Sequence, residues 1–293
     1  MPFSYVEMMN GFGLGDYAEL PSFEPTPRVP LAKPLKDSTI GLFSSCGVRT
    51  PTQRAFVPQN DLTFRMISRD VRVSDLTFEH PTPVRGFAEQ DLNVAYPRDR
   101  LVELESEGHI GRLADNAVSM LGSITTYTRL VKETVPVMAD VFRDQGVDLV
   151  LLIPFCPACH RATSLIARGL EGHGVPCVTI TVLREMAEAF KPARPVFLDY
   201  PLGATAGRPD DPENQRAILR AALSAGAELD GDWRIADLPF EFAPDGNRAW
   251  EDEIRRIYAI TGKQIHRARV TTHLEDGESL VGREEELGIA CAC

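Results

Sequence analysis

The chain has 293 residues, of which 43% are hydrophobic, so it is long enough to form one large α/β domain or two smaller ones. Its 42 acidic and 31 basic residues give a net charge of -11, which argues against a nucleic-acid binder because such proteins carry a basic surface. The N-terminus has neither the basic start nor the apolar run of a signal peptide, and no segment approaches the roughly 18 apolar residues of a membrane span. We therefore expect a cytoplasmic protein that binds neither nucleic acid nor membrane.

The first half of the chain gives few strong patterns. Residues 21–38 hold five prolines, which disfavour helix and central strand and predict an extended arm. The run "TIGLFSSCG" that follows predicts a buried strand ending in a tight turn at Gly47. Residues 97–108 predict a helix opened by proline and closed by glycine, and residues 116–145 predict a longer helix that Pro136 kinks or splits.

After residue 146 the pattern alternates between buried strands and amphipathic helices. The strands are "VDLVLLIP", "PCVTITV" and "PVFLDYP", and the helices are "PACHRATSLIARGLEGHG", "LREMAEAF" and "DPENQRAILRAALSAG". Continuous apolar strands joined by helices are typical of a doubly wound parallel sheet with right-handed crossovers. The fold class predicted is α/β, with two doubly wound, Rossmann- or flavodoxin-like lobes and an extended N-terminal arm.

Four segments follow from these patterns. Residues 1–38 form the arm, and residues 39–115 form a first α/β lobe, which C-terminal residues are candidates to complete. Residues 116–228 form the second lobe, and residues 229–293 form a C-terminal segment that ends in "CAC".

The second lobe carries a Cys-x-x-Cys pair, Cys156 and Cys159, where a predicted strand ends and a predicted helix begins. Open α/β sheets bind ligands at the carboxyl ends of their strands. A helix N-terminus and a Cys-x-x-Cys spacing both lower thiol pKa values. These features predict a nucleophilic Cys156, with Cys159 as a resolving thiol and His160 as a nearby proton donor.

Other interpretations of the pair stay open at this point. Free cysteines are often simply buried hydrophobic residues, and His160 alternatively belongs to a solvated helix surface. A zinc site of Cys156, Cys159 and Cys46, or a histidine in place of Cys46, would need ligands from separate segments. A thioredoxin-like domain also places "CPAC" between a strand and a helix, but the strand–helix alternation and chain length fit a doubly wound sheet better.

Several longer motifs resemble one known family. The segments "PFCPACHRATSLIARGLEGHGVPCVTIT", "FLDYPLGATAGRPDD" and "DLNVAYPRDRLVELESEGHIGRLAD" resemble the selenoprotein B family of glycine, sarcosine, betaine and D-proline reductases. The resemblance covers most of residues 39–226. The family's redox element is a selenocysteine followed two residues later by cysteine, and this chain has Cys156 and Cys159 at those positions.

The resemblance also implies substrate-site residues. The segments "FSSCGVRTP", "LTFEHPTPVRG" and "YPLGATAG" match the family, which places Cys46, His80, Arg85 and Asp91 near the thiols as substrate contacts. Arginine suits a substrate carboxylate because its guanidinium donates two parallel hydrogen bonds, although a solvated surface arginine is an equal expectation. Cys46 is equally a turn residue or a ligand.

The activity implied is thiolate-dependent reductive cleavage of a carbon–nitrogen or carbon–sulfur bond in a small carboxylate-bearing molecule. The family's reductases use a pyruvoyl group on a partner chain, so the resemblance implies a partner subunit, or else a homo-oligomer, and a thiol reductant such as thioredoxin. Two alternatives remain: a zinc-dependent lyase or hydrolase, for example one that desulfurises a thiocarbonyl, and a non-catalytic redox-sensing subunit. Cys291 and Cys293 in the tail are candidates for an electron relay by thiol–disulfide exchange.

Overall fold

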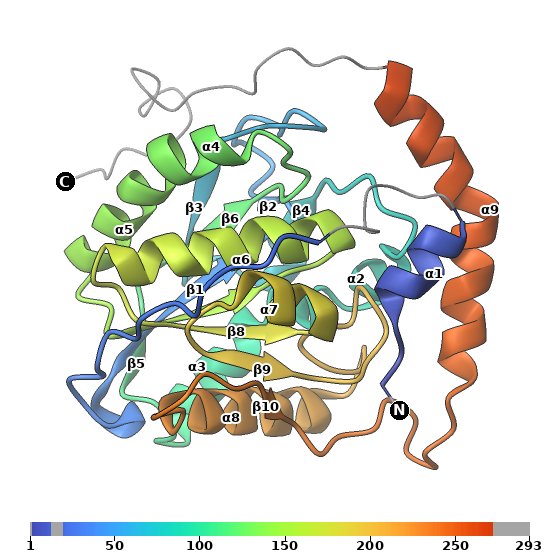
Figure 1. Ribbon diagram of the computed structural model, residues 1–293. Helices are drawn as coiled ribbons and strands as arrows, with labels where there is room; N and C mark the ends of the chain where they lie inside the picture. Colours follow the sequence, from blue (N-terminus) through green and yellow to red (C-terminus); the bar gives the residue numbers. More distant parts are fainter. Residues whose placement is uncertain (1, 13–19, 272–293) are drawn as a thin grey trace.

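The computed structural model describes residues 2–12 and 20–271, with the backbone alone from residue 261 onward. Its centre is a sheet in the order β10-β9-β8-β7-β1-β6-β3, with β5 pairing beside β1, and helices cover both faces (Figure 1). All of these pairings are parallel except that between β3 and β6. The predicted α/β class with a mostly parallel sheet is therefore confirmed.

The strands of this sheet are short and mostly buried. Their bounds are β1 Thr39–Ser44, β3 Phe64–Ser68, β5 Arg112–Leu113, β6 Asn116–Met120, β7 Leu149–Ile153, β8 Cys177–Thr181, β9 Pro195–Phe197 and β10 Ala236–Asp237. A separate antiparallel ribbon pairs β2 Val48–Arg49 with β4 Thr77–Phe78.

The helices alternate with these strands along much of the chain. Their bounds are α1 Tyr5–Gly11, η1 Leu35–Asp37, η2 Val73–Asp75, α2 Gly86–Gln90, η3 Leu92–Val94, α3 Arg98–Ser106, α4 Tyr127–Arg129, the π-helix η4 Leu130–Thr134, α5 Val135–Asp144, α6 Pro157–Gly172, α7 Arg184–Phe190, α8 Pro212–Ala227 and α9 Ala249–Thr271. No helix in the described ranges combines the length and the apolar character needed to cross a membrane.

The sheet has a core on each face because alternate side chains of a strand point to opposite sides. On one face Phe43, Val150 and Leu152 pack with α5 and α6. On the other, Leu42 and Leu151 belong to the cluster that includes residues of α3 and α8. Complete burial of β7 agrees with the uninterrupted apolar run that predicted it.

The prediction of a helix over 116–145 is wrong for its first part. Residues Asn116–Met120 form β6, which pairs with β1 (Phe43↔Val118) and with β3 (Phe64↔Met120). Backbone pairing with two distant strands outweighs the local helical spacing of the apolar residues. The helical residues run without interruption from α4 through the π-helix η4 into α5, and Pro136 lies in the first turn of α5. A kink or split at Pro136 stays a prediction.

Strands from both predicted lobes join one continuous sheet, since β1 pairs directly with β7. The division into two lobes stays a prediction. The sequence also did not predict helix α1, which precedes the extended part of the N-terminal arm.

A buried ion pair fixes the extended arm to the body. Glu171 of α6 accepts hydrogen bonds from the backbone N–H groups of Val29 (2.6 Å) and Cys177 (2.9 Å), and it pairs with Arg194. Arg194 in turn donates to the Val29 carbonyl at 2.5 Å. The side chains of Glu171 and Arg194 are 0% and 4% exposed, so this clamp lies out of contact with solvent.

Candidate functional site

Cys156 lies between the end of β7 and the start of α6, at the carboxyl edge of the sheet, as predicted. It is the N-cap residue of α6, and Pro157 occupies the first helical turn. The Cys159 backbone N–H donates to Cys156 Sγ at 3.3 Å, so the sulfur takes the capping role that a serine or aspartate oxygen usually performs. The local sequence thereby holds Cys156 Sγ over the positive end of the helix.

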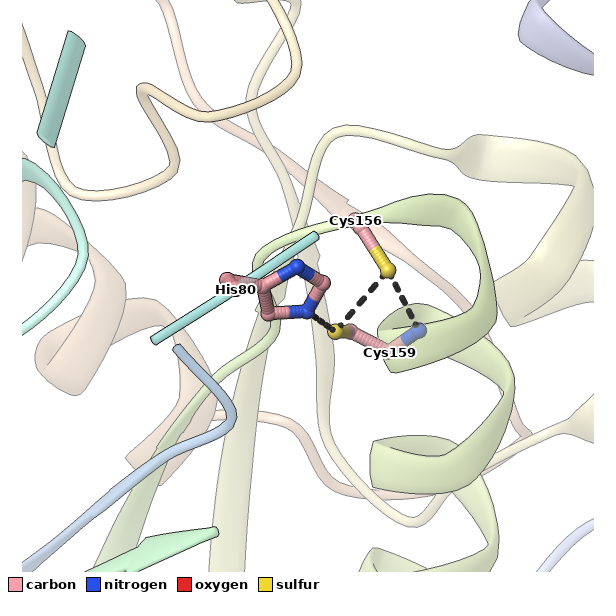
Figure 2. Close-up of side chains that lie close together, drawn as sticks. All are labelled: His80, Cys156 and Cys159. Carbon is pink, nitrogen blue, oxygen red and sulfur yellow. Dashed lines mark hydrogen bonds between the residues drawn. The ribbon is translucent and has the colours of Figure 1, made fainter. Parts of the chain in front are cut away.

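The two thiols form a hydrogen-bonded pair with His80 (Figure 2). Cys156 Sγ donates to Cys159 Sγ at 3.0 Å, and His80 Nε2 lies 3.0 Å from the same Cys159 sulfur. Cys159 Sγ is also 3.6 Å from the carbonyl oxygen of Ser45, which follows β1. Three segments that are far apart in sequence thus meet at one sulfur atom.

These contacts favour a thiolate at Cys159. Burial alone raises the pKa of the Cys159 thiol, but the hydrogen bond from Cys156, together with the charge of His80 and its hydrogen bond, outweighs burial and lowers this pKa well below its ordinary value. Burial raises the pKa of Cys46 and of Cys177 well above the ordinary value. The Cys159 thiol therefore differs in its ionisation from two other buried thiols of the same chain.

His160 is buried rather than solvated, at 1% exposure. Its Nδ1 lies 2.8 Å from the Cys156 carbonyl oxygen, to which it donates, and its Nε2 accepts from the Val182 N–H at 3.3 Å. Both ring nitrogens of the neutral imidazole are thus engaged with backbone, and burial lowers the pKa of His160 to about 4. Its role as a proton donor stays a prediction. In this structure its ring connects the Cys156 carbonyl to the backbone of Val182.

The burial of His160 predicts a pH-dependent stability. Between pH 6.5 and 4 the unfolded histidine binds a proton and the folded one does not, so stability falls as pH falls, by about 3 kcal/mol at pH 4. Urea unfolding across this range should show a smaller decline for His160→Gln than for the wild type. His173→Gln, at an exposed position, is the matched control and should keep the wild-type slope; equal slopes for all three proteins would contradict the assignment.

The backbone of Gly122 lies against the Cys159 side chain. A Cβ atom at this position would lie 2.6 Å from Cys159 Sγ and 2.9 Å from Ser45 Cβ. Such contacts are shorter than packed atoms tolerate, so the glycine is required by the close approach of its backbone to the thiol.

We expect Gly122→Ala to destabilise the protein by about 1–3 kcal/mol, the usual effect of overpacking, and to separate the two sulfurs. Urea unfolding and the rate of disulfide formation under a mild oxidant measure the two effects. Gly172→Ala is the matched control, because a Cβ atom there meets nothing within 4 Å. Wild-type behaviour of Gly122→Ala in both assays would show that the thiol position is not constrained in this way.

The remaining predicted site residues have different surroundings. Cys46 is buried beside Leu121, and its thiol is close enough to Cys159 and Arg85 for their charges to influence its pKa. Arg85 is exposed, pairs with Glu89 and lies over the Phe78 ring. Their roles as substrate contacts stay predictions.

Asp91 holds the backbone rather than facing the thiols. Its carboxylate accepts from the N–H groups of Asn93 and Asp210 and from the Gln215 side chain. Its role in substrate binding also stays a prediction. Cys291 and Cys293 lie outside the described residues.

Sequence reasoning missed three contributors to the site. Ser45 and Gly122 contact Cys159, and the Phe155 ring packs edge-on against His80 with 5.2 Å between centroids. The small residues in "SSCG" and "LGS" were the available signal, because close approach to a buried sulfur requires small neighbours.

A metal site would use His80 rather than Cys46. The ligand atoms of His80, Cys156 and Cys159 all lie within 4.8 Å of one another. Tetrahedral zinc with bonds of about 2.3 Å to sulfur separates two sulfurs by about 3.7 Å. The Sγ–Sγ distance in this structure is 3.0 Å, so a bound zinc would require the two sulfurs to move apart by about 0.7 Å.

The fold and the site define an open α/β protein with a coupled dithiol at the carboxyl edge of its sheet. Comparison with curated proteins finds the D-proline reductase subunit gamma of Acetoanaerobium sticklandii, 31% identical over 230 residues, which are 78% of this chain and 95% of the relative. The chain belongs to the family of component B subunits of D-proline, glycine, sarcosine and betaine reductases, as the sequence motifs indicated.

Two further relatives are longer than this chain. The glycine reductase complex component B subunit gamma of Carboxydothermus hydrogenoformans is 28% identical over 216 residues, 70% of this chain and 49% of the relative. The sarcosine reductase complex component B subunit beta of Peptoclostridium acidaminophilum is 23% identical over 235 residues, 77% of this chain and 54% of the relative. The chain thus spans about half the length of these two relatives. No family profile matches the chain, and no solved structure matches it.

Proposed function

We propose that this chain is the dithiol component of a reductase complex and that it reductively cleaves a carbon–heteroatom bond in a small carboxylate-bearing molecule. The observation that carries the proposal is the hydrogen-bonded pair of sulfurs, 3.0 Å apart at the N-terminus of α6, with His80 on the second sulfur. The reductase complexes to which its relatives belong support the same role at the level of the family.

The dithiol supplies two electrons in two steps. Cys156 transfers its proton to the Cys159 thiolate and attacks the substrate carbon, which forms a thioether. The heteroatom leaves with its bonding electrons and takes that proton from Cys159, which restores the Cys159 thiolate. The Cys159 thiolate then attacks the Cys156 sulfur, which forms the disulfide, and the released carbon keeps the electron pair and takes a proton. An external dithiol, such as a thioredoxin, afterwards reduces the Cys156–Cys159 disulfide.

We propose separate roles for the neighbouring residues. His80 stabilises negative charge on Cys159 before attack and again whenever that thiolate forms, and His160 braces the Cys156 carbonyl. Arg85 is the proposed partner of the substrate carboxylate. Residue 156 is cysteine where the family carries selenocysteine, and sulfur is the poorer nucleophile. We therefore favour a substrate with a sulfur leaving group, which is easier to expel than an amine. No step is routed through a pyruvoyl group of a partner chain.

A trapping variant tests the first step. Cys159→Ser can neither form the disulfide nor accept the Cys156 proton, so the variant is incubated at about pH 9, where a free cysteine ionises without a neighbouring base. A mixture of small N- and S-substituted carboxylates should then leave a stable thioether on Cys156, detectable by peptide mass spectrometry. Cys156→Ser is the matched control and should carry no adduct. Adducts on Cys159 of the control, or none on Cys156 of the trapping variant, would contradict the proposed nucleophile.

A zinc-dependent lyase or hydrolase is the second candidate, and the cluster of His80, Cys156 and Cys159 is the observation that favours it. We expect the purified protein to be free of stoichiometric zinc and to label with iodoacetamide at the Cys-x-x-Cys pair without prior chelation. One zinc per chain, with both cysteines protected until a chelator is added, would instead support the metal-dependent activity.

A further inference from the structure

The dithiol is closed off from solvent in this structure. Cys156 is 2% exposed, Cys159 is 0% exposed and His80 is 2% exposed. Oxidation and reduction of the pair by other molecules therefore require part of the cover to move. Ser45 directly follows β1, and Gly122 lies two residues beyond the end of β6. Both contact Cys159 from the side of the central sheet and are poor candidates for movement.

On the other side, His80 contacts Cys159 Sγ and begins a loop, His80–Arg85, which we call the strap. Its side chains alternate: His80, Thr82 and Val84 are buried, whereas Pro81 and Arg85 are exposed. It follows β4, which belongs to the small ribbon outside the central sheet, and it leads into α2. The strap is thus attached at its ends to peripheral elements.

The strap has few polar contacts with the body of the protein. Among the described residues, one backbone N–H of the strap donates a hydrogen bond to another backbone group. It is the N–H of Thr82, and its acceptor is the His80 carbonyl within the strap itself. Pro81 and Pro83 have no N–H to donate. The contact of His80 Nε2 with Cys159 Sγ is therefore the principal polar link between the strap and the body.

That link depends on the redox state of the thiol. A hydrogen bond to a thiolate is charge-assisted and stronger than a neutral one, whereas a disulfide sulfur carries no charge and is a weak acceptor. In addition, His80 Nδ1 is buried with no partner among the described residues, and opening to water would satisfy it. Disulfide formation removes the strong link and leaves the unfavourable burial of Nδ1.

We propose that His80–Arg85 is a redox-gated strap, which closes over the reduced dithiol and is released when Cys156 and Cys159 form a disulfide. This inference rests on the dithiol chemistry proposed above. Small substrates enter during transient openings of the reduced protein. The larger dithiol protein that reduces the disulfide needs the lasting release, and its two thiols are oxidised to a disulfide as those of Cys156 and Cys159 are restored.

Limited trypsin digestion of the full chain tests the release, because Arg85 is an exposed cleavage site inside the strap. After oxidation to the disulfide, cleavage following Arg85 should be faster by about tenfold or more, as expected for the loss of one charge-assisted hydrogen bond. Cleavage following Arg72, an exposed residue outside the strap, is the internal control and should not change.

Variants at residue 80 identify the link. His80→Ala should be cut rapidly after Arg85 in both redox states, His80→Gln should be intermediate when reduced, and the surface variant His173→Ala should match the wild type. If the disulfide forms and cleavage after Arg85 is unchanged, the strap proposal is overturned and the dithiol function stands. If no Cys156–Cys159 disulfide forms under a strong oxidant, both proposals fall.

Discussion

Glu171→Ala should lower the free energy of unfolding by about 3–5 kcal/mol, the usual effect of removing one partner from a buried ion pair. The substitution leaves the Arg194 guanidinium buried without its carboxylate, and it leaves the N–H groups of Val29 and Cys177 without their acceptor. Urea unfolding at neutral pH measures the change. The same variant should expose the extended N-terminal arm to protease, since Glu171 and Arg194 both bind its backbone at Val29.

Two control variants separate charge from hydrogen bonding. Glu171→Gln keeps a carbonyl acceptor but removes the charge, so we expect an intermediate loss of stability. Asp140→Ala removes a largely exposed partner of Arg143 and should change stability by less than about 1 kcal/mol. A loss in Glu171→Ala no larger than that in Asp140→Ala would show that the arm is not held by this clamp.

Cys156→Ala should raise the apparent pKa of the Cys159 thiol strongly. The hydrogen bond from Cys156 is the largest of the interactions that oppose burial at this thiol, and alanine cannot donate one. Thiolate absorbance in the ultraviolet, followed against pH, measures the ionisation. Cys177→Ala is the matched control and should leave the low-pH transition intact, because burial raises the pKa of that thiol instead. An unchanged transition in Cys156→Ala would show that the sulfurs are not coupled.

The same coupling gives stability a pH dependence of known sign. The folded pKa of Cys159 lies below its unfolded value of about 8.5, so its contribution is complete above that pH and is lost as pH falls through the folded pKa. From about pH 7.5, above the titration of His160 in both states, to about pH 8.5, wild-type stability should rise with pH more steeply than that of Cys156→Ala.

The second half of the chain could be predicted well because its local patterns and its tertiary structure agree. The apolar runs that predicted strands form β7, β8 and β9, and the amphipathic segments between them form α6 and α7. The position of Cys156 at a strand end followed directly from this alternation. Residues 116–120 failed the same reasoning because their strand exists only through pairing with β1 and β3.

The thiol pair was predictable, but its surroundings were not. His80 was placed near the thiols by resemblance to the family, whereas its contact with Cys159 rather than Cys156 is visible only in three dimensions. Ser45 contributes its backbone carbonyl, and Gly122 contributes space because it has no side chain. From the sequence alone, both residues look like ordinary turn positions. Which of the two sulfurs ionises more readily likewise depends on which one His80 contacts.

The pairing of β1 with β7 joins residues 39–44 to residues 149–153, and the thiols lie just beyond that junction. Closing so long a loop is among the slow steps of folding, because the chain loses its entropy before the contact stabilises it. Until those two strands meet, Cys156 and Cys159 have neither His80 nor the Ser45 carbonyl beside them and remain open to indiscriminate thiol exchange. A reducing environment during synthesis therefore protects this chain at the stage when its own fold does not yet do so.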